Sequence, residues 1–528
     1  MNFEMKRICT LLLAGFFFFT NTLLGQDVNP KIVNWYNGAK FGMNTDLAYK
    51  KLLVGKTSTT VIVAVIDSGV DIEHEDLQGK IWTNTDEIAG NKIDDDNNGY
   101  IDDVHGWNFL GNADGENLAH EQLEMTRLYS SYEKRFAGKS YPDLSDDEKA
   151  DYEEYKTVRE KVETERKDAS EQVEFLQDLY DKGSEAETKI KKELGGSYTS
   201  SDLKKLKKDP ELGQDAEFLL ILEQNHITVE DLKEYVDHYN SQLEYHYNID
   251  YDARKVVGDD PDNFEDKFYG NGDVEGPDAM HGTHCSGIIC ANRGNGIGND
   301  GVADNVLIMS IRAVPDGDER DKDIALAIRY AVDNGAQVVN MSFGKSFSPH
   351  QEEVISAIRY AEEKGVLLVH AAGNDGKDIG EEDNFPTPQY PSMSERFSNW
   401  IEVGASTRYK KELAASFSNY SDKMVDIYAP GLEIWSTVPQ SEYEVSQGTS
   451  MAAPMVTGLA ALLKSYFPKL TMFEIKDIIL QSGQDVSTKI TPLPGDVQTI
   501  PFGALCITGK IANTYNAVLM AEEWSAKK

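Results

Sequence analysis

The sequence predicts an α/β fold in which a mainly parallel sheet is flanked by helices and interrupted by an inserted α-helical subdomain. The sheet is predicted by several short, continuous apolar runs rich in β-branched residues, with helix-like segments between them. Such runs are typical of strands that are covered on both faces, as in parallel sheets. The insertion is predicted by residues 116–257, which contain no strand-like run.

The first predicted strand is VIVAVI at 61–66, which is followed by Asp-Ser-Gly. Similar runs predict strands at 306–314, 336–344 and 365–374. The segments 321–335 and 350–365 have apolar residues at three-and-four spacing and end on a glycine, a frequent helix stop. Strands that alternate with helices predict βαβ units, and therefore a parallel sheet with helices on both faces.

Residues 116–257 are rich in Glu, Lys, Asp and Tyr. One face of a long helix is predicted by apolar side chains at three-and-four spacing, which are Tyr155, Val158, Val162, Ala169, Val173, Leu176 and Tyr180. Capping boxes are predicted at Ser145 with Glu148 and at Thr228 with Asp231. We therefore predict a helical hairpin or bundle. Its role stays open between a solvated decoration, a lid, a folding aid and an arm that docks a partner.

The charge balance narrows the classes of partner. Among 528 residues there are 52 Lys and Arg against 90 Asp and Glu, which gives a formal net charge of −38. This excess argues against a nucleic-acid partner, because phosphates require a basic surface. Acidity instead favours solubility and the binding of Ca²⁺ or of basic segments.

Residues 1–25 have the pattern of a signal peptide. Lys6 and Arg7 precede an apolar run from Ile8 to Phe19, as a positive n-region precedes an h-region. The alternative is an N-terminal membrane anchor, although the run is shorter than the ~20 residues of a spanning helix. Cleavage after this segment predicts an exported chain with no membrane span, located in the periplasm, the cell envelope or the medium.

Three cysteines remain after such cleavage, and they show neither a repeated spacing nor a metal-binding pair. They are Cys285, Cys290 and Cys506. One disulfide is conceivable, but we expect buried free thiols.

Three local sequences place reactive side chains at the ends of predicted elements. Asp67 ends a buried strand, at the edge of an α/β sheet where active sites lie. MHGTHCSGIICA presents His281 at a helix start, and QGTSMAAP presents Ser450 before an apolar helix. Each alone has an ordinary structural interpretation, since Ser450 could simply cap its helix. Together they supply the hydroxyl nucleophile, the imidazole base and the orienting carboxylate of nucleophilic catalysis.

A fourth sequence, HAAGNDG, places Asn374 after a predicted strand and beside glycines. Its amide and the backbone N–H of Ser450 are candidate donors for an oxyanion.

The DSG, HGTH, AAGN and GTSMA sequences, in this order, resemble the subtilisin-like serine peptidases, the subtilase family. The order Asp, His, Ser is that of subtilisin, and the 169 residues from His281 to Ser450 compare with roughly 157 there. The resemblance covers about residues 60–110 and 275–525. It implies a subtilisin-like three-layer fold, with a peptidase domain whose two parts are 26–115 and 258–528.

The resemblance also implies a role for each residue. Asp67 would orient His281, which would act as general base and acid while Ser450 attacks the peptide bond to form an acyl-enzyme. Asn374 would complete the oxyanion hole, and His284 would be structural. The substrate backbone would pair with Ser342, Phe343 and Gly344. The loop 381–392 would form a wall of the pocket for the side chain before the cleaved bond, and its acidic residues leave a basic preference open.

Two departures from the family pattern concern length. Asp67 and His281 are 214 residues apart, where the family has about thirty, and the helical insertion accounts for the excess. Only about 40 residues separate Gly25 from Asp67, too few for the usual inhibitory pro-domain. Either the enzyme folds without one, or the insertion takes over part of that work.

The segment KIDDDNNGYIDD predicts a calcium site, because it carries oxygen ligands at alternate positions on a tight turn. The candidate ligands are Asp94, Asp96, Asn98, the Tyr100 carbonyl and Asp102. The alternative is an acidic surface turn, since His105 stands where a calcium loop ends in Glu. Asp76 and Asn295 match a second calcium site of some subtilisins.

The sequence therefore predicts an exported serine endopeptidase that acts on peptides or proteins and holds only structural Ca²⁺. The competing hypothesis is a catalytically idle subtilase fold used as a binding module. An α/β-hydrolase esterase is disfavoured because residues 448–452 are GTSMA rather than G-x-S-x-G.

Overall fold

The computed structural model describes residues 29–225 and 227–528, which form two compact units. Of the described residues, 29–119 and 254–528 form one unit, and His120–Ala253 form the other apart from residue 226. The predicted insertion, 116–257, contains the second unit. The predicted signal peptide lies outside the described residues. Within these residues, no helix is both long and apolar enough to cross a membrane.

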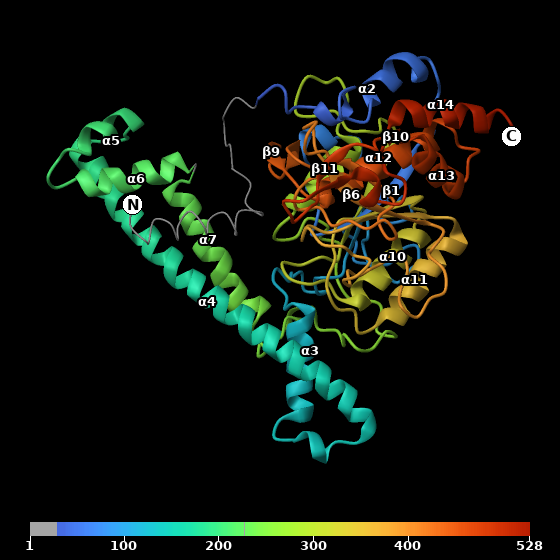
Figure 1. The fold of residues 1–528 in the computed structure, drawn as a ribbon. Coiled ribbons are helices and arrows are strands. Elements are labelled where there is room, and N and C mark those ends of the chain that lie inside the picture. The colour runs from blue at the N-terminus through green and yellow to red at the C-terminus, as the bar shows by residue number, and fades with distance from the viewer. Residues whose placement is uncertain (1–28, 226) are drawn as a thin grey trace. The chain divides into compact units, whose positions relative to one another are not determined.

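Nine strands form the central sheet of the larger unit, in the order β10-β13-β7-β6-β5-β4-β1-β3-β2 (Figure 1). Their bounds are β1 Val61–Asp67, β2 Gly106–Asn108, β3 Val306–Arg312, β4 Val338–Met341, β5 Leu367–Ala371, β6 Trp400–Ser406, β7 Ile427–Pro430, β10 Gln484–Asp485 and β13 Lys510–Ile511. All neighbouring pairs are parallel except β10 with β13. The predicted α/β fold with a mainly parallel sheet is confirmed.

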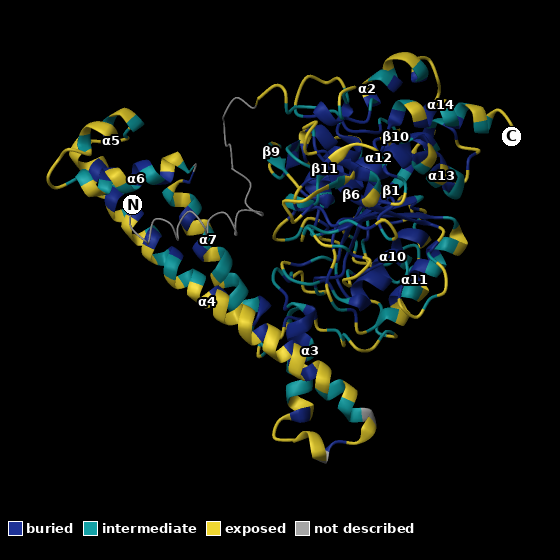
Figure 2. Cartoon of the chain, viewed as in Figure 1, coloured by how far each residue is buried: buried dark blue, intermediate teal, exposed yellow. Residues whose placement is uncertain are grey.

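Helices cover both faces of this sheet (Figure 1). The longer ones are α9 Met280–Cys290, α10 Asp321–Asp333, α11 Gln351–Lys364, α12 Thr449–Tyr466, α13 Met472–Ser482 and α14 Thr514–Ser525. On one face, α9 and α12 pack with Val61, Val63 and Val65 of β1. On the other, α10 packs on β1 and β3, and α11 packs on β5. Figure 2 shows the buried core that these layers enclose.

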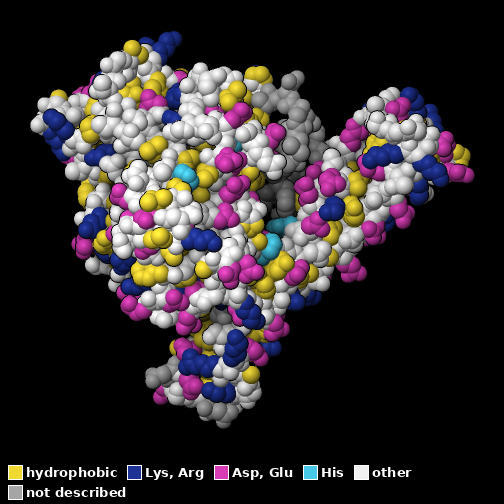
Figure 3. Space-filling model, turned by 180° about the vertical axis from the view of Figure 1, so that it is seen from behind, with side chains coloured by type: hydrophobic (Ala, Val, Ile, Leu, Met, Phe, Trp, Pro, Cys, Tyr) yellow, Lys and Arg dark blue, Asp and Glu magenta, His cyan; other side chains and the backbone are white. Residues whose placement is uncertain are grey.

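Smaller elements complete this unit. They are the hairpin of β8 Ile434–Val438 with β9 Glu442–Ser446, the hairpin of β11 Ile490–Pro492 with β12 Thr499–Pro501, and the short helices α2 Thr45–Ala48 and α8 Arg254–Val257. Figure 3 shows acidic side chains spread over the visible face, with Lys and Arg interspersed, as the net charge of the chain leads us to expect.

The parallel register determines where polar side chains meet. Since β1, β4 and β5 are parallel neighbours, their carboxyl ends lie at the same edge of the sheet. Asp67 ends β1, Ser342 follows β4, and Asn374 follows β5 by three residues. The first turn of α9 reaches this edge through Gly282, where an added Cβ would lie 2.1 Å from the Gly69 carbonyl oxygen. Only glycine permits this approach.

The smaller unit is helical and contains α3 Glu124–Phe136, α4 Asp146–Leu194, α5 Ser200–Leu206, α6 Gly213–Gln224 and α7 Val229–Ser241. Both predicted capping boxes are present, at Ser145 with Glu148 and at Thr228 with Asp231. Most side chains of the predicted apolar stripe of α4 are buried, including Val158 and Val162. The stripe packs against α3, α6 and α7, so a helical bundle is the observed arrangement.

Candidate active site

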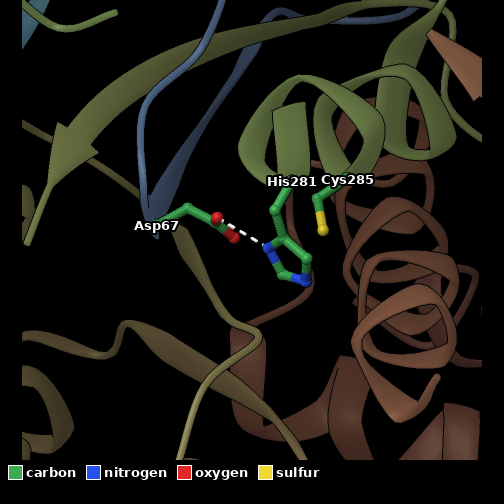
Figure 4. A group of neighbouring side chains, drawn as sticks. All are labelled: Asp67, His281 and Cys285. Atoms are coloured by element: carbon green, nitrogen blue, oxygen red, sulfur yellow. Dashed lines mark hydrogen bonds and ion pairs between the residues drawn. The ribbon is translucent and has the colours of Figure 1, made fainter. Parts of the chain in front are cut away.

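Asp67 and His281 are brought together by the end of β1 and the first turn of α9. His281 Nδ1 lies 2.7 Å from Asp67 Oδ1, and the carboxylate is buried while the imidazole is 37 % exposed (Figure 4). A carboxylate only accepts, so Nδ1 carries the proton and donates it, which leaves Nε2 as an acceptor in the neutral imidazole. Burial lowers the pKa of His281, but the charge and hydrogen bond of Asp67 outweigh this effect and raise it above 6.5.

Cys285 lies one helical turn after His281, and Figure 4 shows its sulfur beside the imidazole. One ligand atom of each of Asp67, His281 and Cys285 lies within 4.8 Å of the others. Sγ donates to the Ser450 carbonyl oxygen at 3.3 Å, and burial raises the pKa of the thiol well above its usual range. A protonated, buried thiol is a poor nucleophile. All three described cysteines are free and buried, as predicted.

Ser450 is the second residue of α12, so its side chain and N–H lie at the positive end of that helix dipole. Its Oγ lies 3.3 Å from the Ser342 carbonyl oxygen, and the Ser342 hydroxyl donates to the Ser450 carbonyl at 3.0 Å. Within the described residues, Oγ forms no hydrogen bond with His281. Bonds between nucleophile and base are often long before substrate binds.

Asn374 is fixed by Thr449, a contact that the sequence analysis missed. The backbone N–H and hydroxyl of Thr449 donate to Asn374 Oδ1 at 2.8 and 3.0 Å, so Nδ2 points elsewhere. An added Cβ on Gly448 would lie 3.4 Å from Asn374 Nδ2 and 3.5 Å from Ser450 N. Both donors therefore flank the same space in front of Gly448. This glycine has φ +149°, which disfavours any side chain there.

The segment Ser342–Gly344 follows β4 beside Ser450. Lys345, the next residue, exchanges two backbone hydrogen bonds with Phe385 of the loop 381–392, at 2.9 and 2.8 Å. Asn384 of that loop donates to the Ala372 carbonyl at 3.2 Å, and its Oδ1 would lie 3.1 Å from a Cβ on Gly344. The loop thus lies against the segment expected to pair with a substrate, where the resemblance places it.

A buried polar group behind this segment was not predicted. His370 Nε2 lies 2.8 Å from the Phe343 carbonyl oxygen, and Nδ1 lies 2.9 Å from Glu402 Oε1. Trp400 Nε1 donates to the same carboxylate at 2.7 Å. Because a carbonyl only accepts, Nε2 is the donor to Phe343, and Nδ1 makes the second contact of the ring with the carboxylate. This pair holds Phe343 in place from β5 and β6.

His284 contacts a different part of the chain from His281. Its Nε2 lies 3.2 and 3.3 Å from the carbonyl oxygens of Ile434 and Glu444, and burial lowers its pKa to about 4. A neutral imidazole that donates to the β8–β9 hairpin agrees with the structural role that the resemblance implies.

The predicted calcium ligands Asp94, Asp96 and Asp102 do not share one set of hydrogen-bond partners. Asp94 and Asp96 both accept from Asn98 N, at 3.1 and 2.9 Å. Asp102 instead accepts from the backbone N–H groups of residues 90–92. The carboxylates grouped within 4.8 Å are those of Asp96, Glu87 and Asp103. The sequence analysis missed the last two, although Asp103 directly follows Asp102.

The second predicted calcium position is more enclosed. Asn295 Nδ2 donates to Asp76 Oδ1 at 2.6 Å, while the buried Asp76 Oδ2 has no hydrogen-bond partner among the described residues. Burial raises the pKa of Asp76.

A hydroxyl at a helix start, an imidazole hydrogen-bonded to a buried carboxylate, and two N–H donors that flank one space are the kinds of group that serine hydrolases use. The family model described as the subtilase family, Peptidase_S8, matches residues 58–493. The chain belongs to the subtilase family.

Relatives with curated names are similar to parts of this chain. The thermophilic serine proteinase of Bacillus sp. (strain AK1) is 38 % identical over 239 residues, which are 45 % of this chain and 53 % of the relative. The cell wall-associated protease of Bacillus subtilis (strain 168) is 36 % identical, over 42 % of this chain and 23 % of the relative. Thermitase of Thermoactinomyces vulgaris is 38 % identical, over 40 % of this chain and 69 % of the relative. The chain thus spans about half of the first relative and about a quarter of the second.

The Asp67–His281 contact predicts the titration of the imidazole. NMR of the His281 ring should give a pKa above 6.5 in the full chain, because the carboxylate stabilises the imidazolium. Asp67→Asn should lower that pKa, whereas Asp86→Asn, which removes an exposed carboxylate that is not among the charges acting on His281, should not. A pKa that is unchanged by Asp67→Asn would contradict the contact.

The His370–Glu402 pair predicts a large stability effect. His370→Ala removes the imidazole partner of the buried Glu402 carboxylate, which keeps only Trp400 among the described residues, and the side-chain partner of the Phe343 carbonyl. It should lower the free energy of unfolding by about 3–5 kcal/mol. Urea denaturation measures this loss. The matched change at the partly exposed His350, His350→Ala, should cost less than about 1 kcal/mol. Equal losses in both variants would show that the buried pair adds nothing.

Proposed function

We propose that this protein is an exported serine endopeptidase in which Ser450, His281 and Asp67 act as the catalytic triad. The observation that carries the proposal is the hydrogen bond between Asp67 and His281 Nδ1, which leaves Nε2 as a proton acceptor. Cys285, which lies beside the imidazole, contacts the Ser450 carbonyl at the start of α12. Membership of the subtilase family supports the same chemistry. The substrates are peptides or proteins.

The reaction follows from these groups. Ser450 Oγ attacks the carbonyl carbon of the peptide while His281 Nε2 takes the hydroxyl proton, and Asp67 stabilises the imidazolium. Asn374 Nδ2 and the Ser450 N–H donate to the oxyanion that forms. The C–N bond then breaks as His281 returns the proton to the leaving amine. Water, activated by the same imidazole, releases the acyl group and restores the hydroxyl.

Peptide binding uses the segment after β4. The extended substrate adds a strand beside Ser342, Phe343 and Gly344, with the loop 381–392 on the far side of its side-chain pocket. The His370–Glu402 pair acts on this segment as a positioning group. We propose that the helical unit docks a partner, because α4 exposes many charged side chains.

Export is supported by the apolar, positively flanked sequence at 1–25 and by the character of relatives. Their names include a cell wall-associated protease and a minor extracellular protease, Epr, both from Bacillus subtilis. A periplasmic, envelope or extracellular address follows from the same argument.

Hydrolysis of casein and of a fluorogenic peptide tests the triad and the oxyanion donor. Ser450→Ala should abolish hydrolysis. Asn374→Ala should lower kcat by about 10²–10³-fold, the range known for loss of one such donor in a subtilisin. Ser131→Ala, a hydroxyl change in the helical unit, should leave both rates unchanged. Casein hydrolysis that persists in Ser450→Ala would favour a different nucleophile, and no hydrolysis by the unaltered chain would favour an idle, binding fold.

We also propose structural Ca²⁺ at two positions. The orphaned Asp76 Oδ2, buried beside Asn295, is an oxygen that a cation would satisfy. At the acidic loop, Asp96, Glu87 and Asp103 supply carboxylates, with Asp94 and Asn98 adjacent. Burial raises the pKa of Asp103 to about 6, so protons should compete with the cation there as the pH falls.

Calcium removal should therefore destabilise the folded chain. Binding to the native state alone contributes about 2.7 kcal/mol at a hundredfold excess over Kd, and EGTA removes this contribution. We expect a lower Tm in EGTA, and a smaller calcium-dependent shift in Asp76→Asn and in Asp103→Asn. Asp485→Asn, outside both positions, should keep the full shift. A Tm that does not respond to calcium in the unaltered chain would contradict both sites.

A further inference from the structure

A cavity of about 510 Å³ lies beside Asn374 and is not explained by the triad. Its walls are Asn374 and Asp375 after β5, Ser416 and Phe417 before β7, and residues 495–497 at the tip of the β11–β12 hairpin. All of these belong to the larger unit. The hairpin tip is therefore one wall of a hollow that begins at the candidate oxyanion donor.

The tip is held firmly against the opposite wall. Gly495 N donates to the Ser416 carbonyl at 2.8 Å. An added Cβ on Gly376 would lie 2.9 Å from Gly495 Cα, so the two backbones touch directly. Asp496 Oδ1 accepts from the backbone N–H groups of residues 497 and 498, which fixes the carboxylate on the turn. These contacts hold the hairpin tip in place as a wall of the cavity.

The cavity lies on one particular side of Asn374. It contains no residue of Ser342–Gly344 and none of the loop 381–392, which are the groups proposed to bind the substrate before the cleaved bond. In a bound peptide whose reacting carbonyl oxygen points at Asn374, the acyl part extends to one side of this carbonyl and the leaving amine to the other. If Ser342–Gly344 and the loop 381–392 bind the part before the cleaved bond, the cavity is on the side left for the residues that follow it.

Its lining combines an apolar surface with two carboxylates. Phe417 offers a mostly buried ring and Val497 is 95 % exposed, while Asp375 and Asp496 are exposed acids. None of the lining residues is Lys or Arg. Lysine and arginine side chains match this surface, because their methylene stems cover apolar groups and their heads carry positive charge.

We propose that this cavity is a subsite that selects a basic side chain on the leaving-group side of the cleaved bond. The proposal rests on the proposed function, since it assumes that Asn374 binds the oxyanion. Asp496 acts through charge, and Val497 through contact with the stem of the bound side chain. The proposed subsite makes Asp496 and Val497, which follow Ser450 by more than forty residues, determinants of specificity.

The test compares kcat/KM for peptides that differ only in the first two residues after the cleaved bond, which are Lys, Gln or Glu. The unaltered chain should prefer Lys, and the preference should weaken as salt screens the charges. Asp496→Asn keeps the turn but removes the charge, and should reduce the Lys-to-Glu ratio about two- to fivefold, as expected for an exposed ion pair. Asp496→Lys should reduce it further.

Asp485→Asn is the matched control, because Asp485 caps a similar turn at Ser487 N and lies outside the cavity. It should leave the ratio unchanged. Equal rates for Lys and Glu peptides, or a Lys preference that Asp496→Asn and Asp496→Lys do not alter, would overturn the subsite while leaving the peptidase activity in place. No cleavage of any peptide would overturn the proposed function, and the subsite with it.

Discussion

The hydrogen bond between Asp67 and His281 joins two segments that are 214 residues apart in the chain. It depends on the approach of α9 to the carboxyl end of β1, which a side chain at Gly282 would block. The bond sets the tautomer of the imidazole, and through it the direction in which a proton can move. The carboxylate is buried, and its charge raises the pKa of the partly exposed imidazole.

The other half of the site is organised by the start of α12. Thr449 binds Asn374, Ser450 bonds with Ser342, and Gly448 leaves open the space that both oxyanion donors face. Consecutive residues of a single turn thus position the proposed nucleophile, the proposed oxyanion donors and the segment expected to pair with a substrate. The sequence left open whether Ser450 only caps its helix. In the structure Ser450 lies inside α12, and the N-cap residue of that helix is Gly448.

Local patterns were sufficient to predict β1, β3, β4 and β5, the helices α10 and α11, and two capping boxes, because each depends on residues close together in the chain. The other five strands of the sheet were not predicted. The segments around Asp67, His281, Ser450 and Asn374 could likewise be recognised from the sequence, because each places a reactive or polar side chain at the end of a predicted strand or helix. His370 was missed because a histidine within an apolar run gives no sign of a partner such as Glu402, thirty-two residues later.

The same limit applies to the acidic loop around Glu87 and to the cavity beside Asn374. Glu87 joins Asp96 and Asp103 only through the folding of a loop, so spacing along the calcium-like segment did not indicate it. Residues 495–497 form a hairpin turn in sequence, and only the tertiary structure places that turn beside Asn374. Side chains that act at a distance along the chain need the fold before their role can be inferred.

The identity of the nucleophile is tested most directly by mapping a covalent adduct. After treatment with a fluorophosphonate, mass spectrometry of the digested chain should find one modified residue, Ser450, and the adduct should form far more slowly when His281 is replaced by Ala. An adduct on another residue, or labelling of Ser450 at the same rate without His281, would contradict the account.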